Sequence, residues 1–245
     1  SDRCATGALL PAGFIPSFVL SVELHAHSAL SHDGRDPIEL LIGQAAAVGL
    51  DAIAITDHDE IEASLRAVDV AQEYGITAIP GMEVTSAAGH ILALGVTETI
   101  SAGLSYPETL DRIRDQGGVA VIPHPFQESR HGVMANIDRD ALATADAIEV
   151  YNSRLFTGRS NRQAERFARR NDMPMTAGSD AHISEMVGQA ITRIDADEAE
   201  LDEMLDAIRE GRTTVEGKRT PWRISLRQFA GGAKRRVASR LSAIR

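Results

Sequence analysis

The sequence predicts a single α/β domain whose strands curl into a closed or nearly closed barrel. From residue 19 onward, short apolar runs alternate with amphipathic stretches, and this alternation is typical of parallel strands covered by helices. About seven such units follow one another in roughly 200 residues, which suits a barrel better than an open sheet. A doubly wound open sheet is the alternative, but no G-x-G-x-x-G motif follows any of the apolar runs.

The expected strands and helices follow one another in order along the chain. The apolar runs that we expect to form strands span residues 19–24, 52–55, 77–79, 91–94, 119–122, 147–150 and 173–177. Helices are expected between most of them, over residues 37–48, 61–74, 107–116 and 159–170. Pro37 and Pro107 stand in expected first turns. Gly49, Gly75 and Gly117 follow expected last turns, where glycine commonly ends a helix.

The composition fits one sizeable core and no membrane span. The chain has 245 residues, of which 43% are hydrophobic. No run of about 18 apolar residues occurs, so we expect no membrane partner. Cys4 is the only cysteine, which excludes a disulfide framework and a cysteine-rich zinc site and favours a cytoplasmic location. We predict an N-terminal extension at residues 1–18, the barrel domain at 19–217 and a basic tail at 218–245.

Charge divides the chain into an acidic body and a basic tail. The formal net charge is −10, yet residues 218–245 hold nine Lys and Arg and no acidic residue, whereas 16 basic and 35 acidic residues precede them. An acidic body suits a salt-rich cytoplasm, although a codon bias towards Arg explains the scarcity of Lys almost equally well. Because aromatic residues are only 4% of the chain, we expect the tail to be solvated or docked on the acidic body rather than bound to nucleic acid. Trp222 and Phe229 are expected to pack against the barrel.

Polar clusters follow nearly every expected strand. In parallel α/β architectures the carboxyl ends of the strands meet on one face, where sites form. Six of the eight histidines are therefore expected to meet at one mouth. The clusters, in chain order, are Glu23-Leu-His25-Ala-His27, Ser31-His32-Asp33-Gly34, Thr56-Asp57-His58-Asp59, Gly81-Met-Glu83, Gly89-His90, Pro123-His124-Pro125, Glu149-Val-Tyr-Asn152 and Gly178-Ser-Asp180-Ala-His182.

Two pairs in these clusters have the spacing of metal ligands. Residues i and i+2 of an extended segment point to the same side, so His25 with His27 can reach one cation, and so can Asp180 with His182. One such pair alone is weak evidence, because similar pairs lie on solvated strand faces. Burying this many imidazoles and carboxylates together is costly without cations that neutralise and coordinate them. Imidazole and carboxylate ligands without thiolate favour Zn, Mn or Fe.

The ordered series of motifs resembles the PHP (polymerase and histidinol phosphatase) family. His-x-His, Ser-x-Asp-Gly, Thr-Asp-His, Gly-x-Glu, Gly-His, Pro-His-Pro and Gly-Ser-Asp-x-His occur in that order between residues 21 and 185. The resemblance implies a distorted (β/α)7, TIM-like barrel that hydrolyses phosphate esters with two or three divalent metal ions. It further implies that a hydroxide formed at the metals attacks phosphorus, so that no protein side chain acts as the nucleophile.

The same resemblance assigns the metal ligands. The first ion would be held by His25, His27, Glu83 and Asp180, the second by His90 and His124 with Glu83 as a bridge, and the third by Asp33, His58 and His182. Asp33 stands where some members have His. Glu23 stands where the family usually has Asp, and we expect it to support the ligands from behind or to accept backbone donors. Asp57 is expected to orient a ligand histidine. His32 is expected to point away from the site, unless it substitutes for a family ligand, and His131 to be a solvated loop residue.

Polar residues near the mouth are candidates for binding the phosphate group of a substrate. Arginine suits this role because its planar guanidinium matches phosphate oxygens. Arg154 and Arg159 are the first candidates and Arg130 is the third. Asn152 is expected to contact the substrate or to cap the turn that follows.

We favour a phosphoesterase that acts on a small phosphorylated metabolite or nucleotide. The nearest alternative keeps the metals but acts as a phosphodiesterase or exonuclease on nucleic-acid ends. Some nucleotide-acting relatives carry a long insertion in the second half of the barrel. The 56 positions from His124 to Asp180 leave no room for one, which favours small substrates. An amidohydrolase-type enzyme would also begin with His-x-His, but it would commonly bridge its metals with a carboxylated lysine at a mid-barrel strand end. The only lysines here are Lys218 and Lys234, which lie beyond the predicted barrel. A non-catalytic metal-stabilised module would have lost ligands, and every expected ligand position is filled.

Overall fold

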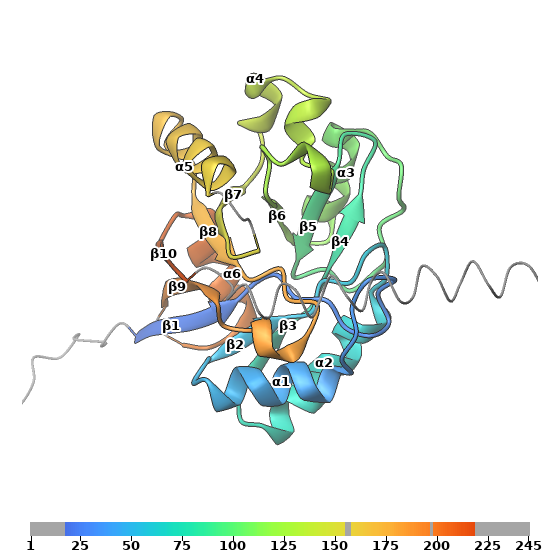
Figure 1. Cartoon of the computed structure of the whole chain (residues 1–245), viewed down its shortest axis with the longest axis vertical. Helices are drawn as coiled ribbons and strands as arrows, with labels where there is room; N and C mark the ends of the chain where they lie inside the picture. Colours follow the sequence, from blue (N-terminus) through green and yellow to red (C-terminus); the bar gives the residue numbers. More distant parts are fainter. Residues whose placement is uncertain (1–17, 155–157, 197, 219–245) are drawn as a thin grey trace, which may run out of the picture.

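The computed structural model describes residues 18–154, 158–196 and 198–218, whose strands form two five-stranded sheets (Figure 1). The strand order is β10-β9-β1-β2-β3 in the first sheet and β4-β5-β6-β7-β8 in the second. The first sheet consists of β1 (Phe18–Glu23), β2 (Ala52–Ala54), β3 (Thr77–Ile79), β9 (Ala190–Ala196) and β10 (Thr213–Gly217). The second consists of β4 (Gly81–Thr85), β5 (His90–Leu94), β6 (Val119–Ile122), β7 (Ala147–Asn152) and β8 (Met175–Gly178).

Helices connect the described strands. The α-helices are α1 (Ile38–Ala47), α2 (Glu62–Glu73), α3 (Tyr106–Asp115), α4 (Arg139–Leu142), α5 (Arg159–Arg170) and α6 (Leu201–Arg209). Short 3-10 turns are η1 (Glu128–Arg130), η2 (Val133–Ala135) and η3 (Ser184–Met186). The four long helices predicted from sequence are present. Pro37 is the N-cap of α1, and Pro107 lies in the first turn of α3 after the Ser105 cap, as the proline signals predict.

The strands are not all parallel, and the hydrogen-bonded sheets do not close into the predicted barrel. β1–β2, β2–β3, β6–β7 and β7–β8 are parallel, whereas β1–β9, β9–β10, β4–β5 and β5–β6 are antiparallel. The reason is clearest at β4 and β5, where residues 86–89 alone connect the strands and Thr85 pairs with His90. A connection this short allows a hairpin but not the helical crossover that parallel strands require.

Two isolated bridges join the sheets just beyond the ends of β1 and β2. Ala26 pairs in parallel with Ala181, and the backbone N–H of His27 donates to the carbonyl of Ala181 at 2.7 Å. His58 pairs in parallel with Glu83 of β4. The bridges bring the polar segments that follow β1, β2 and β8 next to β4, at one edge of both sheets.

The apolar core holds the sheets and helices together as one domain. Val22, Leu94 and Val121, which come from the two sheets, are fully buried. They belong to one cluster with Met204 and Ile208 of α6. Full burial of a large apolar side chain contributes about 1.5–3 kcal/mol. The edge with the polar segments is therefore carried on a well-packed scaffold.

The predicted terminal segments lie largely outside the described residues. Residues 1–17 of the expected extension and residues 219–245 of the expected tail belong to these parts, and so do Trp222 and Phe229. The domain bounds therefore stay a prediction. Within the described ranges, no helix combines the length and the apolar character needed to cross a membrane.

Candidate metal centre and active site

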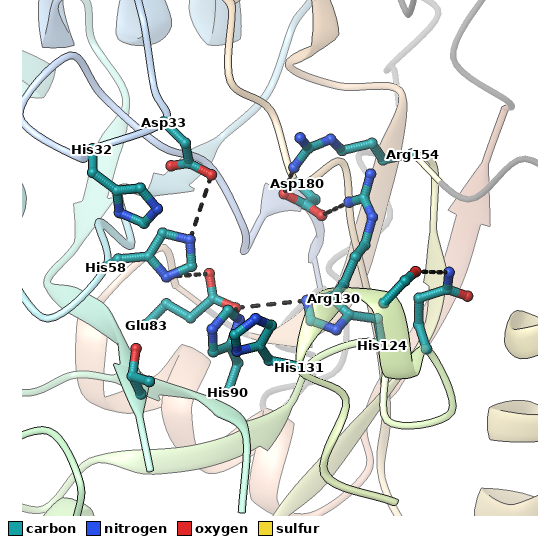
Figure 2. A pocket seen from close by; sticks show the side chains of 13 residues that line it. His32, Asp33, His58, Glu83, His90, His124, Arg130, His131, Arg154 and Asp180 are labelled. Atoms are coloured by element: carbon teal, nitrogen blue, oxygen red, sulfur yellow. Dashed lines mark hydrogen bonds and ion pairs between the residues drawn. The ribbon is translucent and has the colours of Figure 1, made fainter. Parts of the chain in front are cut away.

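The polar segments line a cavity of about 570 Å³ at this edge (Figure 2). The lining residues are His32, Asp33, His58, Glu83, Thr85, His90, His124, Gln127, Ser129, Arg130, His131, Arg154 and Asp180. Figure 2 shows Glu83 between two groups of side chains, with Asp33 and His58 on one side and Arg154 and Asp180 on the other. His25, His27 and His182 are buried in the same cluster behind the cavity lining, and they contact its carboxylates.

The carboxylate of Glu83 is the centre of the cluster. It is only 1% exposed and extends from the middle of β4. Five imidazole rings surround it. Oε2 lies 3.1 Å from His27 Nε2, 3.2 Å from His25 Nε2 and 3.5 Å from His58 Nδ1. Oε1 lies 2.8 Å from His90 Nδ1 and 3.6 Å from His124 Nε2. The two oxygens of one carboxylate thus face two different sets of imidazoles.

Several buried polar atoms of the cluster have no hydrogen-bond partner among the described residues. They are both ring nitrogens of His27, Nδ1 of His58, Nδ1 of His124 and Oε1 of Glu83. A buried polar atom without a partner costs about 1–3 kcal/mol. A group of His25, His27 and Glu83, among others, has ligand atoms within 4.8 Å of one another. Because a cation would satisfy such atoms, the residues fit a divalent metal centre.

Asp180 lies on the other side of the cluster from Asp33. Its Oδ1 lies 3.3 Å from His182 Nδ1 and 3.7 Å from His27 Nε2. Arg130 contacts Oδ2 at 2.5 Å, and Arg154 contacts Oδ1 at 2.9 Å. The two arginine side chains are 21% and 23% exposed and line the cavity. They therefore contact a candidate ligand and the cavity at the same time.

The three residues predicted for a third ion also lie together. Asp33 Oδ2 lies 2.5 Å from His182 Nε2 and 3.6 Å from His58 Nε2. Ser31 Oγ donates to Asp33 Oδ1 at 3.0 Å and so holds the carboxylate in place. The distribution of the ligands among separate ions stays a prediction.

Opposite charges and burial shift the pKa values in the cluster. Burial opposes the charged form of His25, yet the neighbouring carboxylates, Glu83 first, hold its pKa well above the ordinary value. Burial likewise opposes the charged form of Glu83, but the imidazoles, His25 first, hold its pKa well below the usual range. Burial and the positive charge of Arg154 lower the pKa of His182 to about 4, which keeps this ring neutral and able to offer a lone pair.

Glu149, to which the sequence analysis gave no role, holds two candidate ligands. Its Oε1 lies 2.9 Å from Nδ1 of His25, and its Oε2 accepts the backbone N–H of His124 at 3.0 Å. A carboxylate on one ring nitrogen fixes the tautomer and turns the other nitrogen, here Nε2, towards Glu83. The available signal was the position of Glu149 in a polar cluster within a strand of apolar residues.

Close approach and unusual backbone conformations position these groups. A Cβ on Gly178 would lie 2.5 Å from the Cβ of His25 and 2.7 Å from Oε1 of Glu149, so only glycine fits. His124 (φ 34°) and Asp180 (φ 52°) adopt left-handed conformations, which are uncommon for residues with side chains. Such conformations concentrate at functional sites, where the surrounding structure holds them.

Glu23 accepts backbone donors, which is one of the two roles predicted for it. The N–H groups of His25, Ser179 and Gly188 donate to its carboxylate at 3.2, 2.9 and 3.1 Å. Burial raises the pKa of Glu23 to about 7. Glu23 thus ties the segment after β1 to the segment after β8.

Of three further predicted residues, Asp57 and Arg159 have surroundings other than those expected, whereas Asn152 caps the turn that follows it. Asp57 accepts the N–H and the hydroxyl of Ser28 at 2.6 and 2.5 Å, so it stabilises the turn after the His-x-His pair instead of orienting a histidine ring. Asn152 is buried and is not among the residues that line the cavity. Its Oδ1 accepts the backbone N–H of Arg154 at 3.1 Å, which is the predicted cap of the following turn, and its amide donates to Glu149 Oε2 at 3.0 Å. Arg159 is the first residue of α5 and is exposed outside the cavity lining.

The expectation that His32 points away from the site is wrong, because His32 lines the cavity; His131 is a solvated loop residue as expected, and it lines the cavity as well. The His32 ring lies 4.8 Å from that of His58, and the His131 ring stacks at 5.0 Å on that of His90. Both remain exposed, as expected for solvated side chains. The turns that carry them face the cavity, which spacing along the chain does not reveal.

Comparisons with known proteins give the family and similar folds. The model of the PHP-associated family matches residues 158–213. The uncharacterised protein MJ0417 of Methanocaldococcus jannaschii is 34% identical over 176 residues, which cover 70% of this chain and 69% of that protein. A similar fold occurs in a two-domain protein of Bacteroides vulgatus that contains a predicted PHP-like metal-dependent phosphoesterase. The TM-score is 0.71 at 22% identity, and the match covers 82% of this chain and 65% of that one. The lesion-specific endonuclease Q of Pyrococcus furiosus matches with a TM-score of 0.62 and 16% identity, over 81% and 58% of the two chains. The chain belongs to the PHP (polymerase and histidinol phosphatase) family.

Proposed function

We propose that this protein hydrolyses the phosphate ester of a small phosphorylated metabolite or nucleotide, with divalent metal ions held by the cluster around Glu83. One observation carries the proposal: two sets of imidazoles face the two oxygens of a single buried carboxylate. A carboxylate placed in this way suits a bridge between two cations. The nitrogen and oxygen donors without sulfur favour Mn, Zn or Fe.

The proposed ligands follow the three groups in the cluster. We assign His25, His27, Glu83 and Asp180 to a first ion, His90 and His124 with Glu83 to a second, and Asp33, His58 and His182 to a third. When bound, such ions supply Lewis acidity, which activates water for in-line attack on phosphorus and neutralises charge on the phosphate oxygens.

Arg130 and Arg154 supply the charge that receives the substrate. Both line the cavity and both hold Asp180, at 2.5 and 2.9 Å. A guanidinium offers more donors than one carboxylate oxygen uses, so each arginine can keep its contact to Asp180 and donate to a phosphate oxygen as well. Glu149 keeps Nε2 of His25 directed at the cluster throughout.

Substitution of a ligand tests this function. His25→Ala and Asp180→Ala should each lower hydrolysis of p-nitrophenyl phosphate by more than about 100-fold and lower the bound metal, because each removes a donor from the cluster. Metal content by elemental analysis, activity with Mn²⁺ and circular dichroism are measured on the same samples. Arg66→Gln on the surface of α2 is the control and should keep full activity. Full activity of either ligand variant would exclude the mechanism.

Phosphodiester hydrolysis on nucleic-acid ends is the second candidate. The observation that favours it is a row of exposed arginines on α5, next to the cavity. Endonuclease Q, whose fold is similar, is by its name a lesion-specific endonuclease. Activity on p-nitrophenyl phosphate should exceed that on bis(p-nitrophenyl) phosphate if the monoester proposal holds, and the reverse ranking would favour a diesterase.

A further inference from the structure

Helix α5 carries a row of arginines on its solvent face. The five arginines are all exposed and are Arg159, Arg162, Arg166, Arg169 and Arg170. The first four follow one another at intervals of three or four residues, and Arg170 lies four residues after Arg166, so all five lie on one side of the helix. The other side is apolar and buried, with Ala164, Phe167 and Ala168 packed into the domain. We refer to these five arginines as the α5 row.

Little negative charge accompanies the α5 row. Glu165 is the only acidic residue of α5, and it pairs with Arg169 at 2.9 Å. Arg162, Arg166 and Arg170 have no ion-pair partner within the part of the chain that the structure describes. They follow one another at i, i+4, where like charges cost about 0.2–0.5 kcal/mol per pair. A protein with a net charge of −10 therefore concentrates uncompensated positive charge on one helix.

The α5 row begins at the rim of the cavity. Ser160 Oγ donates to Gln127 Oε1 at 2.8 Å, and Gln127 lines the cavity. Asn161 exchanges two hydrogen bonds with the backbone of Asn152, at 3.2 and 3.0 Å. Arg154, two residues after Asn152, also lines the cavity. In Figure 1, α5 runs from this end of β7 along the outside of the molecule.

We propose that the α5 row binds successive phosphates of a single-stranded nucleic acid whose terminal phosphate enters the metal cluster. This inference rests on the second candidate function, hydrolysis at nucleic-acid ends, and names the surface that would hold the strand. The row is about 16 Å long, at 1.5 Å per residue. A stacked strand carries a phosphate about every 3.4 Å, so several phosphates can be contacted. A cavity of about 570 Å³ admits the end of a strand, and the helix guides what lies outside it.

Other anionic surfaces fit the α5 row less well. A membrane-binding helix needs an apolar face that can enter the lipid, whereas the apolar face of α5 is already buried in the domain. The absence of a long insertion between His124 and Asp180 favoured small substrates, but the α5 row provides a surface for a polyanion without any insertion. Contacts of arginine with phosphates carry no sequence preference, so binding should be salt-dependent and independent of base sequence.

The test compares two double variants of the full chain with equal loss of charge. Arg162→Gln with Arg166→Gln removes two arginines of the α5 row. Arg66→Gln with Arg112→Gln removes two exposed arginines from α2 and α3 and is the matched control. Fluorescence anisotropy measures binding of a 5′-phosphorylated, 3′-fluorescein-labelled DNA strand of about 12 nucleotides, in EDTA to prevent cleavage.

We expect the α5 variant to bind the strand about tenfold more weakly than wild type near 0.1 M salt. The slope of log K against log salt should fall in magnitude by about 1.4, because two phosphate contacts are lost. The control should keep the wild-type slope. Equal slopes for all three proteins would overturn the inference, and so would a loss of equal size in both variants. Binding of anionic phosphatidylserine vesicles, but not of the strand, would also overturn it.

Hydrolysis separates this inference from the proposed function. With Mn²⁺, the α5 variant should lose more kcat/KM on the strand than on p-nitrophenyl phosphate, because the small ester cannot extend from the metal cluster to the helix. Equal losses on both substrates would contradict the inference while leaving the proposed function intact. If wild type hydrolyses neither substrate, the proposed function fails, and the proposed entry of the strand end fails with it.

Discussion

At the level of single residues, the imidazoles around Glu83 are held by groups that leave them little freedom. Glu149 accepts from His25 on the side away from Glu83, and Gly178 leaves just enough space for both. Spacing along the chain could identify His25 and His27 as a pair, because i, i+2 neighbours share a face. It could not identify Glu149, since a contact across 124 positions leaves no local pattern.

Gly178→Ala tests how tightly this arrangement is packed. The new methyl group would overlap with the Cβ of His25 and with Oε1 of Glu149, so the carboxylate must move away from the ring. We expect a loss of roughly 10- to 100-fold in kcat/KM for p-nitrophenyl phosphate. The free energy of unfolding should fall by about 1–3 kcal/mol, as for other overpacked sites.

Gly43→Ala in α1 is the control for this substitution. Its Cβ would meet only the side chain of Tyr74, whose nearest ring atom lies at 3.2 Å, and alanine favours a helix more than glycine does. This control should retain activity. A Gly178→Ala protein with wild-type kcat/KM would show that the Glu149–His25 contact is not needed for catalysis.

At the level of helices and strands, the local signals predicted the helices better than the strand directions. Helix α1 begins directly after Pro37, and α3 begins after the Ser105 cap with Pro107 in its first turn; these signals act within one turn. The strands β4, β9 and β10 were not among the expected runs, because Gly81–Thr85 and Thr213–Gly217 mix polar and apolar residues. Antiparallel pairing of β1 with β9 depends on packing between distant segments, which no local pattern encodes.

Helix α3 shows how a buried polar group affects stability. Tyr106 begins this helix and is 4% exposed, and its hydroxyl has no hydrogen-bond partner among the described residues. Burial raises the pKa of Tyr106 above its ordinary value of 10. The folded protein therefore retains the phenol proton at a pH where the unfolded chain has lost it, so stability falls as the pH rises above about 10.

Tyr106→Phe should remove this dependence. Near pH 7 the variant should be as stable as wild type or about 1 kcal/mol more stable, because it deletes an unsatisfied buried hydroxyl. Above pH 10 its advantage over wild type should grow. Urea unfolding of both proteins between pH 7 and 11 measures the difference. An advantage that shrinks with rising pH would mean that the phenolate is tolerated in the fold.

At the level of the whole molecule, the candidate ligands come from both sheets. His25, His27 and His58 follow strands of the first sheet, whereas Glu83 and His90 belong to the second. The sequence predicted that these groups converge at strand ends, and the structure brings them together at one edge. The closed barrel expected from the alternation of strands and helices is not formed, because only isolated bridges join the sheets there.

Metal ions bound in this cluster would connect the two sheets, so removing them should destabilise the whole domain. A ligand present at 100 times its dissociation constant stabilises a fold by about 2.7 kcal/mol. For a chain of this size, we expect EDTA to lower the Tm by roughly 5–10 °C relative to saturating Mn²⁺. Differential scanning fluorimetry measures the shift.

His27→Ala should show a smaller shift, because it removes a ring with two unsatisfied nitrogens from the centre of the cluster. If wild type unfolds at the same temperature with and without divalent metal, bound metal does not connect the two sheets. The negative charge of the carboxylates is then balanced by protons on the imidazoles alone.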